Sequence, residues 1–375
     1  MNPAPRSLGL DALRGGAVAL MILVNNPGSW QHLFPPLAHA PWHGLTPTDL
    51  VFPFFLFAVG ASLAFALPQL GGGFWRRVTQ RAALLFAIGL FLNASPFLRW
   101  SAEGELVLRA WDDLRVMGVL QRIALAYFLA AVIVRCCGAR GALAAALALL
   151  LGYWAACIAF GGADPYSLEG FFGTALDRAL LGPAHLYQGE GVAFDPEGLA
   201  STVPAVAQVL LGHAAGRLLV RHPLDAILMA RLFTIACALL ALGYAWQLAM
   251  PLNKKLWTGS YVLVTSGLAL AALALLVQWL DTRGPRGAVA TALLAFGRNA
   301  LFMFVLAGLL PRLLALARWK DGEAWTSPLP WLYRHVFAAI PGDPRLGSLA
   351  YALAVLAALV ALALWMDRRH LYVRV

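Results

Sequence analysis

Charged residues are scarce in this chain. Lys, Arg, Asp and Glu together make up 12% of its 375 residues, about half of the roughly 25% that is typical of soluble domains. Hydrophobic residues make up 61%, more than a protein core alone accommodates. The composition therefore excludes a soluble globular protein and predicts an all-α polytopic integral membrane protein.

Cysteine is equally rare. The four cysteines lie in apolar stretches or at their edges and show no metal-binding spacing, so neither a disulfide framework nor a cysteine metal site is expected. The chain also lacks a Gly-x-Ser-x-Gly elbow, a Walker-type glycine loop and a dinucleotide fingerprint. These absences weigh against a nucleophilic triad, ATP hydrolysis and redox chemistry.

Long apolar stretches are abundant instead. About ten of them have the length of roughly 20 residues that crosses a hydrocarbon core about 30 Å thick. They cover residues 9–26, 47–68, 80–98, 116–135, 141–161, 203–221, 226–247, 259–281, 290–312 and 346–366. We expect a single transmembrane domain over residues 1–375. The first stretch ends in Asn25-Asn26-Pro27, which is not the pattern of a cleaved signal peptide.

The distribution of arginine predicts the orientation. If the N- and C-termini are cytoplasmic, the cytoplasmic connections are short and rich in arginine, and the exoplasmic connections are long and nearly neutral. This positive-inside bias accounts for most of the net charge of +10, so no nucleic-acid partner is expected. Lys254-Lys255 is the main exception, because this pair lies in a short exoplasmic loop.

Several ionisable residues lie within or beside the predicted spans, where they are costly and therefore indicate a reaction or transport site. Asp11 and Arg14 share a helix face, either as a structural pair or with Arg14 as a ligand of a phosphate-bearing molecule. Arg122 and Arg298 lie inside apolar runs and belong either to an inter-helix network or to a ligand site. Asn25 either caps the first helix or donates a hydrogen bond to a developing oxyanion.

Three histidines, His32, His39 and His43, follow the first span, and Asp49 opens the next one. The histidines are candidates for a metal site, for an exposed polar loop, or for a general base. The loop has no cysteine, and prolines interrupt helical spacing, which weighs against a metal. A neutral imidazole with a pKa near 6.5 is suited to removing a proton from an amine or hydroxyl.

The long loop before residue 200 groups a base, an aromatic ring and two carboxylates in His185, Tyr187, Asp195 and Glu197. Such a set can hydrogen-bond sugar hydroxyls, although Asp-Pro-Glu-Gly is also an ordinary turn. Trp42 and the other loop tryptophans are typical of an interfacial belt.

Five segments, in this order, resemble the heparan-α-glucosaminide N-acetyltransferase family. They are SLGLDALRGGAVALMILVNN, AHAPWHGLTPTDLVFPFFLFAVG, RVMGVLQRIALAYF, DPEGLASTVPAVAQVLLGHAAG and PLNKKLWTGSYVLVTSG. The resemblance extends over essentially the whole membrane domain. Bacterial members of the family include proteins encoded beside N-acetylglucosamine utilisation genes. The opening LDALRG is also similar to the broader transmembrane acyltransferase superfamily.

The resemblance implies an enzyme that moves the acetyl group of cytosolic acetyl-CoA across the membrane to the amine of a glucosamine-type acceptor. It implies that His39, just before Trp-x-Gly-Leu-Thr, is the catalytic base and that Asn25 assists it. Asp49 matches the family aspartate that opens the following span. The chain starts almost directly at the first span and has no exoplasmic cysteine, unlike the animal enzymes. The acceptor therefore does not carry over, and a bacterial inner membrane is the expected location.

We therefore expect acetyl-CoA as co-substrate and no metal. Residues expected to bind acetyl-CoA are Arg14, Asp11, Arg76, Arg77, Arg122 and Arg298. Residues expected to contact the acceptor are Trp42, His185, Tyr187, Asp195 and Glu197. Expected partners are the lipid bilayer and an amino-sugar or glycan acceptor, and a homodimer is left open. The alternative is an inner-membrane transporter of N-acetylglucosamine or a related sugar, but the chain lacks evident internal repeats.

Overall fold

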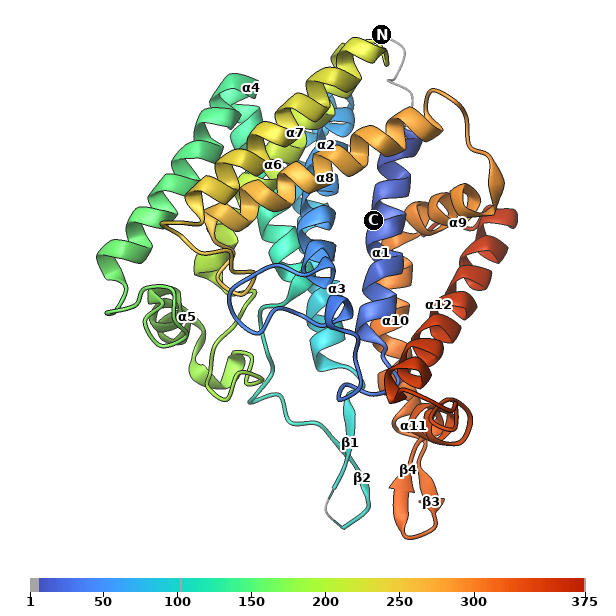
Figure 1. The fold of residues 1–375 in the computed structure, drawn as a ribbon. Coiled ribbons are helices and arrows are strands. Elements are labelled where there is room, and N and C mark those ends of the chain that lie inside the picture. The colour runs from blue at the N-terminus through green and yellow to red at the C-terminus, as the bar shows by residue number, and fades with distance from the viewer. Residues whose placement is uncertain (1–6, 102, 374–375) are drawn as a thin grey trace.

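A computed structural model of the protein describes residues 7–101 and 103–373, and most of them are helical (Figure 1). The helices are α1 (Leu8–Asn25), α2 (Val51–Leu70), α3 (Phe74–Ala94), α4 (Val119–Phe160), α5 (Phe172–Leu181), α6 (Leu199–Arg221), α7 (Ala226–Trp246), α8 (Gly259–Leu280), α9 (Gly287–Arg298), α10 (Ala300–Leu314), α11 (Pro328–Leu332) and α12 (Pro344–Arg368). Short helical turns cover Pro35–Leu37, Pro47–Leu50, Gly71–Gly73, Pro183–His185 and Tyr333–Phe337. The strands are β1 (Leu98–Trp100), β2 (Leu106–Leu108), β3 (Trp319–Asp321) and β4 (Ala324–Thr326).

Seven helices in the described part of the chain are long and apolar enough to cross a membrane, or up to eight if the bent pair α9–α10 counts as one span. A polytopic membrane protein is therefore the class to which this chain belongs. The helix α3 corresponds to another predicted span, but its first turns carry Arg76, Arg77 and Arg81, which lower its apolar character.

The helix α4 contains two of the predicted spans in one run. Its backbone leaves the helical conformation at Gly138, where φ is 64°, a value that glycine adopts without a steric penalty. Val119, at the start of α4, lines the same cavity as Lys254. Tyr153, near the end of α4, donates a hydrogen bond to the carbonyl of Leu256 at 2.6 Å. Both ends of α4 thus lie beside the same loop, so the chain doubles back at Gly138.

The predicted span 290–312 is broken. The helices α9 and α10 meet at an angle of 82°, and Asn299 occupies the break. Its Nδ2 donates to the carbonyl of Leu371 at 3.1 Å, and its Oδ1 accepts from the amide of Val373 at 3.0 Å. The Asn299 side chain therefore holds the backbone of the segment after α12 against the break between α9 and α10.

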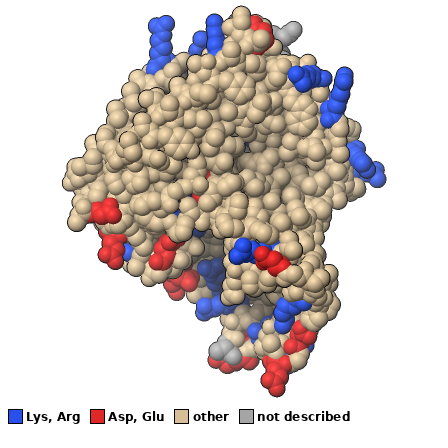
Figure 2. All heavy atoms as spheres, in the orientation of Figure 1, with Lys and Arg blue, Asp and Glu red and all other residues tan. Residues whose placement is uncertain are grey.

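The two ends of the bundle differ in structure and charge. At one end, α1 finishes and the hairpins β1–β2 and β3–β4 extend away from the helices (Figure 1). We call this the loop end, and we call the opposite end, where α1 begins, the arginine end. Lys and Arg project over the arginine end with almost no acidic neighbours, whereas the loop end carries both Lys and Arg and most of the Asp and Glu (Figure 2). The hairpins add a few strands to a chain for which an all-α fold was expected.

The helix α1 is the central element, because it contacts α2, α8, α9, α10 and α12. Asp281, at the end of α8, accepts hydrogen bonds from the first amides of α1, at 2.8 Å from Leu8 and 2.7 Å from Gly9. These bonds satisfy donors that a helix start leaves free. A Cβ atom on Gly15 would lie 1.9 Å from the carbonyl oxygen of Leu293 in α9. The close crossing of α1 and α9 therefore requires glycine.

We predict that Gly15→Ala destabilises the bundle by about 1–3 kcal/mol, because the added methyl group forces α1 and α9 apart. Gly16→Ala is the matched control. A Cβ at Gly16 meets only the flexible side chain of Leu293 at 3.7 Å, so no loss of stability is expected there. Thermal unfolding of both variants in the same detergent tests the crossing, and equal midpoints would contradict it.

Candidate functional site

The carboxylate of Asp49 organises the loop between α1 and α2. Its side chain is 1% exposed. Its Oδ2 accepts hydrogen bonds from the amide of Ala40 at 3.1 Å, the amide of Thr46 at 3.1 Å and the hydroxyl of Thr46 at 3.0 Å. Thr46 and Asp49 form a capping box at the helical turn that leads into α2, a pattern that fixes helix starts. One carboxylate thus begins α2 and folds the preceding loop back on itself.

The same carboxylate orients His39. Its Oδ1 lies 2.7 Å from Nδ1 of His39, whose side chain is 45% exposed. A carboxylate at this distance requires a proton on Nδ1, because two acceptors would otherwise face each other. We therefore assign the proton to Nδ1. Nε2 is then the ring atom that carries the lone pair, and it lies 3.4 Å from Nζ of Lys254, so a substrate that gives its proton to Nε2 approaches beside this ammonium group.

Lys254 completes this group from a distant part of the chain. Its Nζ lies 3.0 Å from Nδ1 of His39 and 3.4 Å from Oδ1 of Asp49. Burial lowers the pKa of Lys254 below its ordinary value, and the charge of Asp49 opposes this effect. The ammonium group therefore faces both the carboxylate and the imidazole and balances the negative charge beside His39.

The loop after α7 is built to present Lys254. Asn253 Oδ1 accepts from the amide of Leu256 at 2.9 Å, and the hydroxyl of Thr258 accepts from the amide of Asn253 at 3.1 Å. Trp257 is buried and donates to Gln208 at 3.0 Å. These contacts fix a tight turn, so the position of the Lys254 side chain is set by the folded loop.

His39 and Asn25 line one cavity of about 250 Å³, which we call the catalytic cavity because the sequence predicts a catalytic role for both residues. Lys254 and Glu197 are also in its wall, and the rest of the lining is mainly apolar. Asn26, the next residue in the chain, caps α1 by donating from Nδ2 to the carbonyl of Ile22 at 2.9 Å. The structure therefore brings Asn25, His39 and Asp49 together, as expected for three residues with a common role.

A second cavity, of about 360 Å³, lies toward the arginine end, and we call it the arginine cavity. Arg14, Arg81 and Arg298 line it. Arg14 pairs with Asp11, and Arg298 pairs with Asp367 at 2.7 Å. The catalytic and arginine cavities share an apolar wall formed by Phe55, Leu120, Ile123 and Leu301. This shared wall, which we call the neck, makes the two cavities neighbours along the bundle.

Three other arginines that were expected to bind acetyl-CoA, Arg76, Arg77 and Arg122, lie outside the arginine cavity. Arg76 and Arg77 are exposed and do not line the arginine cavity. Arg122 is 0% exposed and lies at the loop end. Its guanidinium donates to the carbonyl of Pro196 at 2.5 Å and to the hydroxyl of Ser201. These contacts fasten the start of α6, while Nε and NH1 of Arg122 have no hydrogen-bond partner among the described residues.

Asp195 and Glu197, in the long loop before α6, form an ion-pair cluster with Arg115. The guanidinium lies 2.6 Å from Asp195 Oδ1 and 2.5 Å from Glu197 Oε2. The ring of Tyr187 lies under it at 4.9 Å. Burial opposes ionisation, but the hydrogen bond to Asp195 and the charge of Glu197 raise the pKa of Arg115 above its ordinary value. Of the two carboxylates, only Glu197 reaches the catalytic cavity.

Two further residues expected at the acceptor lie outside the catalytic cavity. Trp42 donates from its indole nitrogen to the carbonyl of Tyr166 at 2.8 Å and packs against Phe194. Nδ1 of His185 lies 2.8 Å from the carbonyl of Leu114. Both residues therefore support loops around the site.

The loop histidines do not converge. His32 lines a small crevice beside α12, and His43 lies 3.3 Å from the side chain of Asn253. Within residues 7–101 and 103–373, no group of three or more His, Cys, Asp or Glu side chains is arranged to hold a metal.

Sequence reasoning missed two residues of these cavities. Lys254 was noticed only as an exception to the charge bias, and this misplaced positive charge was the available signal. Arg81 lies in the arginine cavity, with its guanidinium 5.2 Å from the ring centre of Tyr127. It follows Arg76 and Arg77 by about one helical turn, and the sequence offered no reason to prefer it.

Comparison with known proteins places the chain in a family. The profile of the family described as "Heparan-alpha-glucosaminide N-acetyltransferase, catalytic" matches residues 6–250. The chain is similar to human heparan-alpha-glucosaminide N-acetyltransferase, with 29% identity in an alignment 344 positions long that covers 75% of this chain and 50% of the human protein. The mouse protein of the same name is 29% identical in an alignment 334 positions long that covers 73% of this chain and 49% of the mouse protein.

The chain thus spans about half the length of the curated relatives that it matches. The profile covers more than half of the chain, and it includes Asn25, His39, Asp49 and Arg81. The chain therefore belongs to the heparan-alpha-glucosaminide N-acetyltransferase family.

Proposed function

We propose that the protein is a membrane-bound acetyltransferase that moves the acetyl group of acetyl-CoA to the amine of an amino-sugar acceptor on the opposite side of the membrane. The names of the relatives specify an N-acetyltransferase acting on a glucosaminide. The observation that carries the proposal is the contact between the catalytic cavity, with His39 and Asn25, and the arginine cavity through an apolar neck.

In this proposal the arginine end faces the cytoplasm and the loop end faces the exoplasm of a bacterial inner membrane. Both chain termini are then cytoplasmic. The ten predicted spans include both legs of α4 and the helix α3, and residues 1–375 form one domain. The excess of Lys and Arg over Asp and Glu at the arginine end supports this orientation (Figure 2), because positive residues accumulate in cytoplasmic loops.

The arginine cavity suits the charged part of acetyl-CoA. Arg14, Arg81 and Arg298 offer guanidinium donors at the end that faces the cytoplasm, and such groups bind phosphates in a planar, bidentate manner. The neck suits the thin, uncharged pantetheine arm, since its shared lining is apolar. The thioester is thereby brought to the catalytic cavity at the loop end. The exoplasm, which this end faces, has no acetyl-CoA of its own.

The chemistry follows from the atoms of the catalytic cavity. The acceptor nitrogen attacks the thioester carbonyl, and Nε2 of His39 takes the proton that the amine loses. The amide of Asn25 donates to the oxyanion of the tetrahedral intermediate. The C–S bond then breaks, and the proton passes from His39 to the sulfur of CoA. An order in which Nε2 first carries the acetyl group uses the same atoms.

We predict that His39→Ala abolishes acetyl transfer and leaves acetyl-CoA binding unchanged, because the side chain is nearly half exposed and supplies the base. Asn25→Ala should lower turnover by roughly 10²–10³ through loss of an oxyanion donor. His43→Ala is the control, since His43 lies outside the catalytic cavity. Turnover is measured with radiolabelled acetyl-CoA and glucosamine in proteoliposomes. Full turnover in His39→Ala would remove the base assignment.

We predict that Arg81→Gln weakens acetyl-CoA binding about tenfold, or about 1.4 kcal/mol, because one phosphate loses a charged donor. Arg76→Gln removes the same charge from an exposed position of the same helix and should bind as the wild type does. Calorimetry with purified protein gives both dissociation constants. An equal loss of acetyl-CoA affinity in both variants would mean that the overall positive charge of the protein, and not the arginine cavity, determines this affinity.

We predict that Lys254→Met lowers turnover about tenfold, equivalent to about 1.4 kcal/mol in the activation barrier, because the charge of Asp49 beside His39 is then unbalanced. Lys255→Met is the matched control. Lys255 pairs with Glu190 at 2.7 Å and not with His39. Steady-state kinetics of the two variants separate a local effect from a change in loop charge, and similar rates in both would argue against a role for Lys254.

A transporter of N-acetylglucosamine is the second candidate, and the break between α9 and α10 is the observation that favours it. Discontinuous helices form the binding sites of many transporters. Uptake of labelled N-acetylglucosamine into proteoliposomes without acetyl-CoA tests this candidate. Saturable uptake in the absence of acetyl transfer would place it first.

A further inference from the structure

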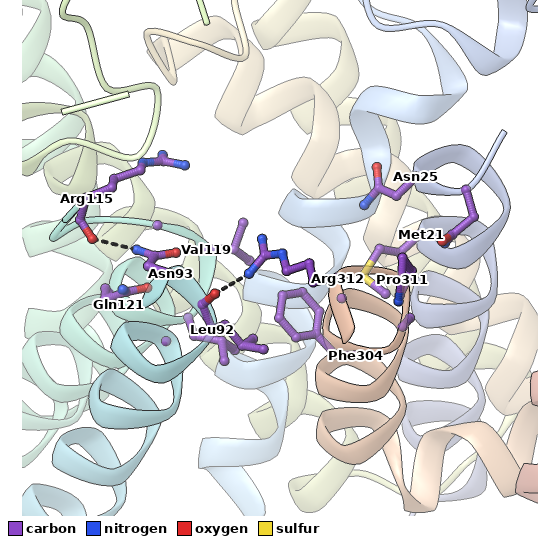
Figure 3. A pocket seen from close by; sticks show the side chains of 16 residues that line it. Met21, Asn25, Leu92, Asn93, Arg115, Val119, Gln121, Phe304, Pro311 and Arg312 are labelled. Atoms are coloured by element: carbon purple, nitrogen blue, oxygen red, sulfur yellow. Dashed lines mark hydrogen bonds between the residues drawn. The ribbon is translucent and has the colours of Figure 1, made fainter. Parts of the chain in front are cut away.

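A third cavity, of about 390 Å³, adjoins the catalytic cavity at the loop end. The two cavities share Met21, Asn25, Val119, Leu120 and Phe304 in their walls. We call the third one the amide cavity, because Asn25, Asn26, Asn93 and Gln121 line it (Figure 3). Its other polar side chains are Arg115 and Arg312. A molecule that reaches Asn25 from the catalytic cavity can therefore extend into the amide cavity.

Gln121 is the least expected residue in this lining. It is 1% exposed, and its Nε2 has no hydrogen-bond partner among the described residues. Its side chain lies close to two glycines: a Cβ on Gly89 would be 2.3 Å from Oε1, and one on Gly118 would be 3.0 Å from it. A buried amide donor without an acceptor is costly. Its position in the cavity wall indicates that a ligand supplies the acceptor.

The helix α4 begins at the same place. Its N-cap is Gly118, and no side chain caps the first turn. Gly118, Val119 and Leu120 line the amide cavity. The first amides of a helix lack intrahelical partners and carry a partial positive charge, so this end of a helix attracts anions. The free Nε2 of Gln121 is an independent second donor beside them.

Arg312 adds a full positive charge. Its NH1 donates to the carbonyl of Leu92 and, at 3.1 Å, to the hydroxyl of Ser95. Among the residues that the structure describes, no carboxylate pairs with it, whereas Arg115 is already neutralised by Asp195 and Glu197. No Asp or Glu side chain lines the amide cavity. The cavity therefore offers donors and net positive charge, which suits an anion.

We propose that the amide cavity is a subsite for an anionic group, a carboxylate or a phosphate, carried by the acceptor. Gln121, Arg312 and the first turn of α4 hold this group, while the acceptor amine lies at His39 in the catalytic cavity. This inference rests on the proposed function. It makes an acidic amino sugar, and not neutral glucosamine, the preferred acceptor.

The first experiment compares glucosamine 6-phosphate with glucosamine as acceptors of the purified protein in proteoliposomes. The wild type should show at least a tenfold higher kcat/KM for the phosphorylated sugar. Gln121→Glu replaces the free donor by a carboxylate of the same shape, so this preference should disappear. Gln247→Glu adds the same charge at an exposed position of the loop end and should keep the preference. Equal kcat/KM values for the two sugars in the wild type would overturn the inference, as would an unchanged preference in Gln121→Glu.

A binding measurement keeps the inference testable where a variant does not fold or no sugar is acetylated. Glucosamine 6-phosphate should raise the thermal unfolding midpoint of the wild type more than glucosamine does, and Arg312→Gln should lose this difference. Stabilisation by inorganic phosphate or by phosphatidylglycerol, but not by the phosphorylated sugar, would assign the anion to another source and overturn the acceptor subsite. Acetyl transfer to neither sugar, with this stabilisation present, would refute the proposed acetyltransferase and leave the anion site in place.

Discussion

The carboxylate of Asp49 is the constraint on which the site depends. Asp49 lies at the start of α2, is 1% exposed, and a buried charge of this kind must be fully paired. Its partners come from the loop before α2 and from the loop after α7, which are about 200 residues apart in the sequence. Tyr261 in α8 also donates to the Asp49 carbonyl at 2.6 Å. The carboxylate of Asp49 therefore joins the two loops around His39, and its main-chain carbonyl adds the contact to α8.

The helix α1 makes this local arrangement part of the whole bundle. It carries Arg14 in the arginine cavity and Asn25 in the catalytic and amide cavities. Its crossing with α9 at Gly15 and its capping by Asp281 hold these two polar groups at a fixed separation along one rigid element. Residues of α1 line all three cavities, so this one helix fixes the positions of the cavities relative to one another.

Much of this structure could be predicted from the sequence, because long apolar runs with arginine at one end report helices and their approximate bounds. The reversal of the chain at Gly138 agrees with the two separate spans predicted at 116–135 and 141–161. The break at Asn299 is harder to foresee, since the apolar pattern continues through it. The cluster of Asn25, His39 and Asp49 lies in one segment and could be found from the resemblance. Lys254 and Gln121 could not, because their roles arise from contacts between distant segments. The residue type alone did not predict the surroundings of Arg122, which lies at the loop end and holds the start of α6.

The apolar neck between the arginine and catalytic cavities has a consequence for the membrane itself. An open passage through a helix bundle would let ions leak down the gradients that a membrane maintains. A narrow apolar constriction prevents such a leak, because water leaves it readily. Phe55, Leu120, Ile123 and Leu301 form the apolar wall that the arginine cavity and the mainly apolar catalytic cavity share. The same four side chains that would surround a thin uncharged arm would therefore also act as the permeability barrier against protons and other ions.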